Sequence, residues 1–252
     1  MPDSDYRLEG RWAVVTGSTR GIGKAIALEL AAGGSNVVVH GRDRQAADEV
    51  VAAIRQFKRE AIAVVTDLAD AASRRELVHG LWRERPIDVW VNNAGVDVLT
   101  GESADWSFDD KLRRLWEVDV LGTVELSRAV GARMKERGQG SIVNIGWDQA
   151  GTGMAGDSGE MFAVAKGGIM DFTRSLAKSL APAVRVNCIA PGWIRTAWGE
   201  EASEYWQERA KGESLLNRWG EVEDIARVAR FLASDAASFV NGQTIAVNGG
   251  RH

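Results

Sequence analysis

The chain has 252 residues, and its 31 Lys and Arg side chains against 35 Asp and Glu give a formal net charge of −4 at pH 7. A protein that neutralises many phosphates needs a basic stripe, which this sequence lacks, so we exclude nucleic acid as a partner. With 45% hydrophobic and 26% charged residues, the composition is that of an ordinary folded domain and excludes a disordered chain.

The cysteine and histidine content limits the chemistry further. The single cysteine, Cys188, excludes an intrachain disulfide, and its place in a predicted strand indicates a small buried side chain. The three histidines (His40, His79 and His252) are far apart in sequence, so we expect no metal site. Residues 1–11 are acidic without an apolar stretch, and no run approaches the roughly 18 to 20 apolar residues of a membrane span. We expect a cytoplasmic protein with no membrane partner.

Short β-branched runs alternate with longer amphipathic stretches along the chain. The runs predict seven strands, at residues 12–16, 36–40, 61–66, 87–92, 141–145, 184–189 and 244–247. Helical patterns lie between them, for example over residues 23–32 and 162–180. The predicted order of elements is therefore strand and helix in alternation.

Continuous apolar strands joined by helices predict a parallel sheet that is covered on both faces. The fold class is α/β, a doubly wound parallel sheet (Rossmann fold) in a single domain over residues 1–252. A (β/α)₈ barrel is the alternative at this length, but it needs eight strands and a phosphate site late in the chain. The least regular segment, residues 191–218, is expected to fold over a pocket as a lid.

A glycine-rich loop follows the first strand, with the sequence T-G-S-T-R-G-I-G over residues 16–23. Gly17, Gly21 and Gly23 allow the backbone to approach a pyrophosphate, whose charge the free amides and positive end of the next helix stabilise. A tight turn with packing glycines is the alternative explanation. We interpret the loop as a nucleotide phosphate site.

The loop resembles the nucleotide loop of the short-chain dehydrogenase/reductase (SDR) family, whose pattern is T-G-x-x-x-G-x-G. Other segments extend the resemblance over nearly the whole chain. They are D-L at 67–68, N-N-A-G at 92–95, P-G at 191–192 with Thr196, and N-G-G at 248–250. The resemblance implies a nicotinamide cofactor, a small-molecule substrate and a carbonyl or alcohol as the reacting group.

The resemblance also assigns roles to residues around that cofactor. Asp67 and Leu68 would contact the adenine, residues 93–95 would border its ribose, and Ile194 and Thr196 would hold the carboxamide. The full set of expected cofactor-binding residues is Gly17, Ser18, Thr19, Arg20, Gly21, Ile22, Gly23, Arg42, Asp67, Leu68, Asn93, Ala94, Gly95, Lys166, Pro191, Gly192, Ile194 and Thr196.

The charge at the end of the second strand favours NADP(H) over NAD(H). An acid at this point binds the ribose hydroxyls of NAD, whereas an Arg accommodates the additional phosphate of NADP. Gly41 stands where the acid would be, Arg42 follows it, and Arg20 lies in the glycine loop. Two guanidiniums suit a 2′-phosphate. Asp43 is the residue that would weaken this interpretation, by pairing with Arg42.

The catalytic positions depart from the family pattern. In the family, a Tyr four residues before a Lys transfers the proton, with a Ser and an Asn in support. Here Lys166 is present, but Phe162 stands at the Tyr position, and phenylalanine transfers no proton. Asp119 occupies the Asn position. The Ser position falls on Trp147 or Asp148, according to the end of the segment from which it is counted.

A carboxylic acid is the predicted replacement for the missing tyrosine. Asp148, buried against aromatic side chains, would have a raised pKa and would act as proton donor, with Gln149 donating to the substrate oxygen. Water is the alternative proton source. Asp157 and Glu160 lie nearby, but we expect them to cap a helix that starts near residue 161. Tyr205 is a remote substitute.

The predicted catalytic residues are thus Lys166, Asp148 and Asp119, and Trp147, Gln149, Phe162 and Trp193 are predicted to line the substrate pocket. An apolar, Trp-rich pocket favours a hydrophobic or aromatic substrate. The resemblance further implies a homodimer or homotetramer formed through helices 111–135 and 161–180 and the last strand.

The sequence therefore favours an NADP(H)-dependent oxidoreductase of a carbonyl/alcohol pair with an altered proton-transfer site. A non-redox lyase or isomerase on the same fold remains an alternative, because the tyrosine is missing. A catalytically inactive NADP(H)-binding protein is the other alternative, because the cofactor loop by itself does not require turnover.

Overall fold

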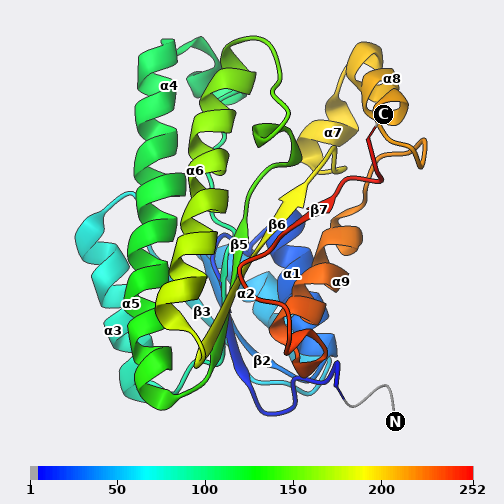
Figure 1. Ribbon diagram of the computed structural model, residues 1–252. Coiled ribbons are helices and arrows are strands. Elements are labelled where there is room, and N and C mark those ends of the chain that lie inside the picture. The colour runs from blue at the N-terminus through cyan, green and yellow to red at the C-terminus, as the bar shows by residue number, and fades with distance from the viewer. Residues whose placement is uncertain (1–4, 252) are drawn as a thin grey trace.

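Seven parallel strands form one open sheet in the order β3-β2-β1-β4-β5-β6-β7 (Figure 1). The computed structural model describes residues 5–251. The strands are β1 (Trp12–Val15), β2 (Asn36–Gly41), β3 (Ala61–Val65), β4 (Val89–Asn92), β5 (Gly140–Ile145), β6 (Val184–Pro191) and β7 (Thr244–Val247). This order confirms the predicted doubly wound sheet and excludes the barrel, in which the sheet would close on itself.

Helices cover both faces of the sheet (Figure 1). One layer contains α1 (Gly21–Ala32), α2 (Arg44–Arg55) and α9 (Val222–Ala233), and the other contains α3 (Ala71–Glu84), α5 (Gly122–Arg137) and α6 (Asp157–Leu180). The remaining helices are α4 (Phe108–Leu115), α7 (Ala197–Glu201) and α8 (Glu204–Gly212). Each layer buries its own apolar cluster against the sheet, so the strands are apolar on both sides.

The central strands show why this sequence forms a buried parallel sheet. Residues 37–39 of β2 are all Val and fully buried, and Ala13, Val14 and Val15 of β1 are fully buried too. β-branched side chains suit a strand whose two faces are both packed. Connections from β1 and from β4 leave the sheet toward opposite layers, which opens a crevice at the carboxyl ends of these two strands. Cys188 is buried in β6, as the sequence indicated.

The predicted helix over residues 111–135 is wrong as a single regular helix. α4 ends at Leu115, a π-helical turn spans Trp116–Leu121, and α5 follows. Such a turn accommodates an additional residue, which the apolar periodicity does not reveal. It contains Asp119, whose carboxylate is buried and accepts a hydrogen bond from the backbone N–H of Val96 at 3.0 Å.

The start of α6 also differs from the prediction. The helix begins at Asp157 after Gly156, and Asp157 and Glu160 lie in its first turn instead of capping a later start. Gly156 has φ +94°, a conformation that glycine tolerates, and no side chain caps the helix. The two acids therefore act on the helix through its dipole.

Candidate active site

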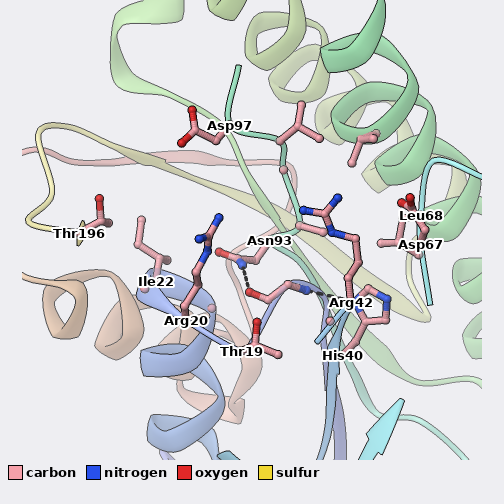
Figure 2. Close-up of a pocket in the computed structure, with 18 of the residues that line it drawn as sticks. Thr19, Arg20, Ile22, His40, Arg42, Asp67, Leu68, Asn93, Asp97 and Thr196 are labelled. Carbon is pink, nitrogen blue, oxygen red and sulfur yellow. Dashed lines mark hydrogen bonds between the residues drawn. The ribbon is translucent and has the colours of Figure 1, made fainter. Parts of the chain in front are cut away.

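A cleft of about 340 Å³ opens at the carboxyl ends of β1, β2 and β4 (Figure 2). Most of the residues that the sequence predicted for cofactor binding line it, and Ser18, Lys166, Pro191, Gly192 and Ile194 do not. The predicted residues that line the cleft are Gly17, Thr19, Arg20, Gly21, Ile22, Gly23, Arg42, Asp67, Leu68, Asn93, Ala94, Gly95 and Thr196. The fold thus gathers distant segments into one concave surface.

The glycine loop forms the floor of this cleft at the start of α1. Gly17 has φ +62°, and a Cβ there would lie 2.8 Å from the Cα of Ala94. A Cβ on Gly23 would lie 2.2 Å from the carbonyl oxygen of Gly17. The Asn93 side chain donates a hydrogen bond to the carbonyl oxygen of Gly17 (Figure 2) and another to that of Thr16, both at 3.0 Å. Only glycine fits these two positions, and the loop leaves the first amides of α1 free for an anion.

Two arginines supply positive charge to the cleft. Arg20 and Arg42 both line it, and Figure 2 shows their guanidiniums directed into it. Neither guanidinium forms a hydrogen bond or ion pair within residues 5–251. Asp43 does not pair with Arg42, because its carboxylate caps α2 by accepting from the Ala46 N–H at 3.1 Å. The residues present therefore fit an anionic group larger than a pyrophosphate alone.

Asp97 is the acid that faces Arg20 across the cleft, but its own loop already holds it. Its carboxylate accepts hydrogen bonds from the N–H groups of Leu99 and Thr100 and from the Thr100 hydroxyl. Burial tends to raise the pKa of Asp97, but these hydrogen bonds and the nearby Arg20 charge outweigh it, so the pKa is lowered. The hydrogen bonds of the carboxylate come from its own loop, and Arg20 acts on it only as a nearby charge.

His40 also lines the cleft, which the sequence did not predict. Its imidazole is buried, and Nδ1 accepts a hydrogen bond from the Gly17 N–H at 3.2 Å. Burial lowers the pKa of His40 to about 4, so the ring is neutral at pH 7 with its proton on Nε2. Ser18 lies behind it, with its hydroxyl donating to the Val15 carbonyl and accepting from the His40 N–H. These hydrogen bonds of Ser18 and His40 hold the glycine loop in place next to β2.

Lys166 and Asp119 form a buried ion pair beside the cleft. The distance from Nζ to Oδ2 is 2.8 Å, and the two side chains are 14% and 2% exposed. Oδ1 of Asp119 accepts from the Val96 N–H, so both carboxylate oxygens have partners. A Cβ on Gly95 would lie 2.9 Å from Oδ2, which shows how closely the cleft wall approaches this pair.

The position four residues before Lys166 is apolar. Phe162 packs against the cluster formed by α4 and α6, and its ring lies 6.2 Å from that of Trp147 in an edge-to-face arrangement. Gln149 is buried in a short 3₁₀ turn after β5. Phe162 and Trp147 therefore give this part of the site, next to Lys166, an aromatic wall.

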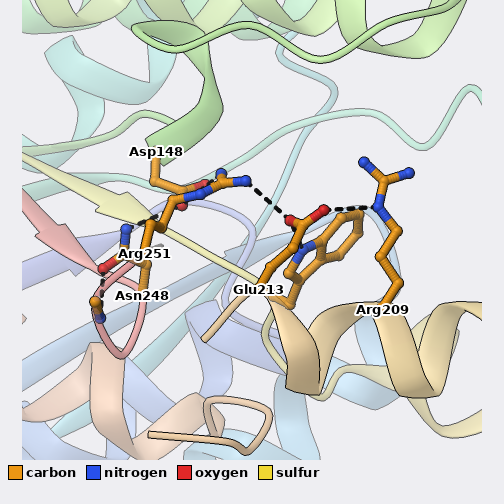
Figure 3. Close-up of polar contacts among 7 residues, drawn as sticks. Asp148, Arg209, Glu213, Asn248 and Arg251 are labelled. Atoms are coloured by element: carbon orange, nitrogen blue, oxygen red, sulfur yellow. Dashed lines mark hydrogen bonds and ion pairs between the residues drawn. The ribbon is translucent and has the colours of Figure 1, made fainter. Parts of the chain in front are cut away.

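Asp148 is the first residue of the same 3₁₀ turn and lines a separate small cavity outside the nucleotide cleft. Its Oδ2 accepts from Nδ2 of Asn248 at 3.0 Å and from Arg251 at 3.2 Å (Figure 3). Arg251 also donates to Glu213 at 2.9 Å. Burial raises the pKa of Asp148, although Asn248 and Arg251 lower it. No signal in the sequence pointed to Arg251 and Glu213, since long-range pairs leave no local pattern.

Segment 191–218 contains α7 and α8 and an aromatic cluster. Trp193, Trp198 and Trp206, together with Trp219 just beyond the segment, form five ring pairs with centroids 5.5 to 6.2 Å apart. Trp198 is partly exposed and reaches the nucleotide cleft. Tyr205, by contrast, is 65% exposed and packs on Trp206. The cluster forms a continuous apolar wall from the cleft toward Trp193.

Within residues 5–251 we find no group of three or more His, Cys, Asp or Glu side chains that could hold a metal ion. In the same range, no helix is long and apolar enough to cross a membrane.

Comparisons with known proteins agree with this geometry. A family model described as enoyl-(acyl carrier protein) reductase matches residues 17–252. The 3-oxoacyl-[acyl-carrier-protein] reductase FabG of Aquifex aeolicus is 35% identical over 254 residues, 98% of this chain and 99% of that protein. Dehydrogenase/reductase SDR family member 4 of Mus musculus is 35% identical over 250 residues, 96% of this chain and 88% of that protein.

The fold also matches those of solved structures of dehydrogenases. A gluconate 5-dehydrogenase from Burkholderia cenocepacia J2315, in complex with NADP and tartrate, has a TM-score of 0.89 and 31% identity. The match covers 99% of this chain and 98% of that chain. The chain belongs to the short-chain dehydrogenase/reductase family. Membership supports a redox role with a nicotinamide cofactor.

Proposed function

We propose that this protein is an NADP(H)-dependent oxidoreductase that interconverts a carbonyl compound and its alcohol at an altered proton-transfer site. The observation that carries the proposal is that the guanidiniums of Arg20 and Arg42, beside an intact glycine loop, form no hydrogen bond or ion pair within residues 5–251. An arginine at the end of β2 is the feature that accommodates a 2′-phosphate. NADP is bound in the Burkholderia relative, which agrees with this choice.

Different residues of the chain would bind different parts of NADP(H). The amides at the start of α1 hold the pyrophosphate, and the two arginines hold the 2′-phosphate. Asp67 and Leu68 flank the adenine. The remaining positions around the ribose, nicotinamide and carboxamide are Asn93, Ala94, Gly95, Lys166, Pro191, Gly192, Ile194 and Thr196. When bound, the nicotinamide supplies or accepts the hydride.

Proton transfer falls to Asp148 or to water, because we propose that the chain lacks the catalytic Tyr and Ser of its family. Phe162 has no proton to give. Asp148 is buried, its pKa is raised, and its Oδ1 makes no hydrogen bond within residues 5–251. A carboxyl group in such surroundings donates a proton in the reduction and accepts it in the oxidation. Gln149 would steady the substrate oxygen.

A hydrophobic or aromatic substrate fits the walls of the site best. Trp147 and Phe162 form one wall, and Trp193 and Trp198 belong to the aromatic cluster of segment 191–218. Apolar rings desolvate a substrate and position its carbonyl through shape. Segment 191–218 would act as the lid.

We further propose a homodimer or homotetramer in the cytoplasm. Trp116 and Val164 are 44% and 52% exposed on the helical layer of α5 and α6, where an apolar surface favours a partner copy. Light scattering coupled to size-exclusion chromatography would give the oligomeric state directly.

The test of the function has two stages. The first is titration of the protein with NADPH and NADH, followed by Trp fluorescence and energy transfer to the nicotinamide. We expect NADPH to bind at least about 10-fold more tightly, since each charge-assisted contact is worth about 1.5 to 3 kcal/mol.

The second stage of the test is a panel of aldehydes and ketones with NADPH, followed at 340 nm. Tight binding without turnover on any substrate would favour an inactive NADP(H)-binding protein, and no binding of either cofactor would favour a non-redox enzyme.

A further inference from the structure

Arg251 links two carboxylates that are far apart in sequence and line the same small cavity. One guanidinium nitrogen lies 3.2 Å from Oδ2 of Asp148, after β5, and the other lies 2.9 Å from Oε2 of Glu213, after α8 (Figure 3). Asp148 is 3% exposed, whereas the other two side chains are about a quarter exposed. A planar guanidinium that holds one carboxylate at each of two nitrogens has a fixed orientation.

We propose that Arg251 is a positioning residue, which orients Asp148 and couples it to the aromatic segment 191–218. This inference rests on the proposed function only for the proton-transfer role of Asp148. The orientation and the coupling follow from the contacts themselves.

The coupling runs through Glu213 to the aromatic cluster. Its Oε2, which accepts from Arg251, also accepts from the indole N–H of Trp193 at 2.8 Å. Its Oε1 accepts from Arg209 at 2.7 Å, and the Arg209 guanidinium lies 5.0 Å from the ring of Trp206. Glu213 and Arg209 are each about a quarter exposed, so solvent screens these interactions only in part. A movement of α8 therefore acts on the same guanidinium that contacts Asp148.

The orientation of Asp148 follows from which oxygen is engaged. Arg251 and Asn248 both donate to Oδ2, whereas Oδ1 is buried and accepts no hydrogen bond within residues 5–251. The two donors fix the carboxyl plane and leave Oδ1 as the oxygen free for proton exchange. Without Arg251, Oδ2 would keep only the Asn248 contact among the hydrogen bonds within residues 5–251.

Arg251 is also the cation that faces Asp148 most directly. The other charged groups around the same small cavity are Glu213 and Arg218, and Arg218 is paired with Asp224 at 2.8 Å. Arg209 lies beyond Glu213 and offsets its charge. Removal of Arg251 would leave a buried carboxyl group facing Glu213 without an adjacent cation, which favours the protonated form.

Backbone contacts hold the segment around Arg251 in place, so the role of the Arg251 side chain can be tested separately. Arg251 pairs with Ser214 in an isolated antiparallel bridge, and the N–H groups of Leu215 and Leu216 donate to the carbonyls of Gly250 and Gly249. These contacts remain when the side chain is changed. Arg251→Met and Arg251→Lys thus alter the guanidinium without releasing the chain end.

The experiment measures the pKa of Asp148 and the exchange of α8 amides in the whole protein. Asp carboxyl groups are labelled with ¹³C, the Asp148 signal is assigned by its loss in Asp148→Asn, and its shift is followed against pH. We expect an apparent pKa about one to two pH units higher in Arg251→Met, and near the wild-type value in Arg251→Lys. Hydrogen exchange over residues 204–213 should be about 5-fold faster in Arg251→Met.

Two further variants separate positioning from general loosening. Arg209→Met separates Glu213 from its other cation, so α8 should exchange faster, while the pKa of Asp148 should rise by much less than in Arg251→Met. Glu213→Gln removes the competing carboxylate, so the pKa of Asp148 should fall. The proposal is overturned if Arg251→Met leaves that pKa in place, or if Arg209→Met raises it equally. Because neither readout needs turnover, an inactive carbonyl panel would overturn the proposed function and leave this result standing.

Discussion

The ammonium of Lys166 and the carboxylate of Asp119 lie 2.8 Å apart and join α6 to the π-helical turn before α5. The pair is almost entirely removed from solvent. A buried ion pair contributes little net stability, because desolvation of two charges offsets their attraction, but the loss of one partner leaves an uncompensated charge. Lys166 is therefore held in one place next to Gly95 and Val96 in the cleft wall.

Removal of the carboxylate should destabilise the fold strongly. Asp119→Ala is expected to lower the free energy of unfolding by about 3 kcal/mol, because it leaves the Lys166 ammonium and the Val96 N–H without partners. Asp119→Asn should cost less, since its oxygen still accepts from Val96. Glu76→Ala, which breaks an exposed pair with Arg83, is the control and should change stability by less than about 0.5 kcal/mol. Urea unfolding measures all three, and equal costs for Asp119→Ala and the control would contradict the prediction.

Cofactor preference should depend on the two unpaired arginines. Arg42→Ser and Arg20→Ser are each expected to weaken NADPH binding by about 10- to 100-fold, the equivalent of one charge-assisted hydrogen-bonded contact, and to leave NADH binding nearly unchanged. Arg44→Ser is the matched control, because Arg44 lies at the start of α2 and pairs with Asp48. Fluorescence titration gives the three affinities. An equal loss for NADH would show that the arginines act on the shared part of the cofactor.

How far the sequence predicts this structure depends on the range of the interaction. The glycine loop and the strands are local patterns, so residues 16–23 and the seven strands could be placed before the fold was known. The Asp43 cap was ambiguous, because a carboxylate next to Arg42 suits either a helix start or an ion pair. The contact of Asp148 with Arg251 spans 103 residues and leaves no periodic signal. Only the fold brings the two together.

Burial of His40 makes stability depend on pH. Its folded pKa of about 4 lies below the unfolded value of about 6.5, so the unfolded chain binds more protons between these two values. Stability is therefore complete above about pH 6.5 and is lost as pH falls toward 4. We expect a loss of about 2 kcal/mol from this residue between pH 7.5 and pH 5, after the same loss in His40→Asn is subtracted. Urea unfolding at both pH values tests it, and identical pH slopes in the two proteins would remove the imidazole as the cause.

The raised pKa of Asp148 predicts opposite pH profiles for the two directions of reaction. Reduction needs the protonated carboxyl group, so kcat/KM for reduction should fall as pH rises through this pKa, whereas kcat/KM for oxidation should rise. With a substrate from the carbonyl panel, Asp148→Asn should abolish the pH dependence of kcat/KM in both directions. It should also slow the reaction by about 10²- to 10⁴-fold. Initial rates at 340 nm across the pH range give both profiles, and Asp157→Asn, in the first turn of α6, is the control. A variant Asp148→Asn that keeps the wild-type profile would assign the proton to water, because no other feature of the reaction requires this carboxyl group to titrate.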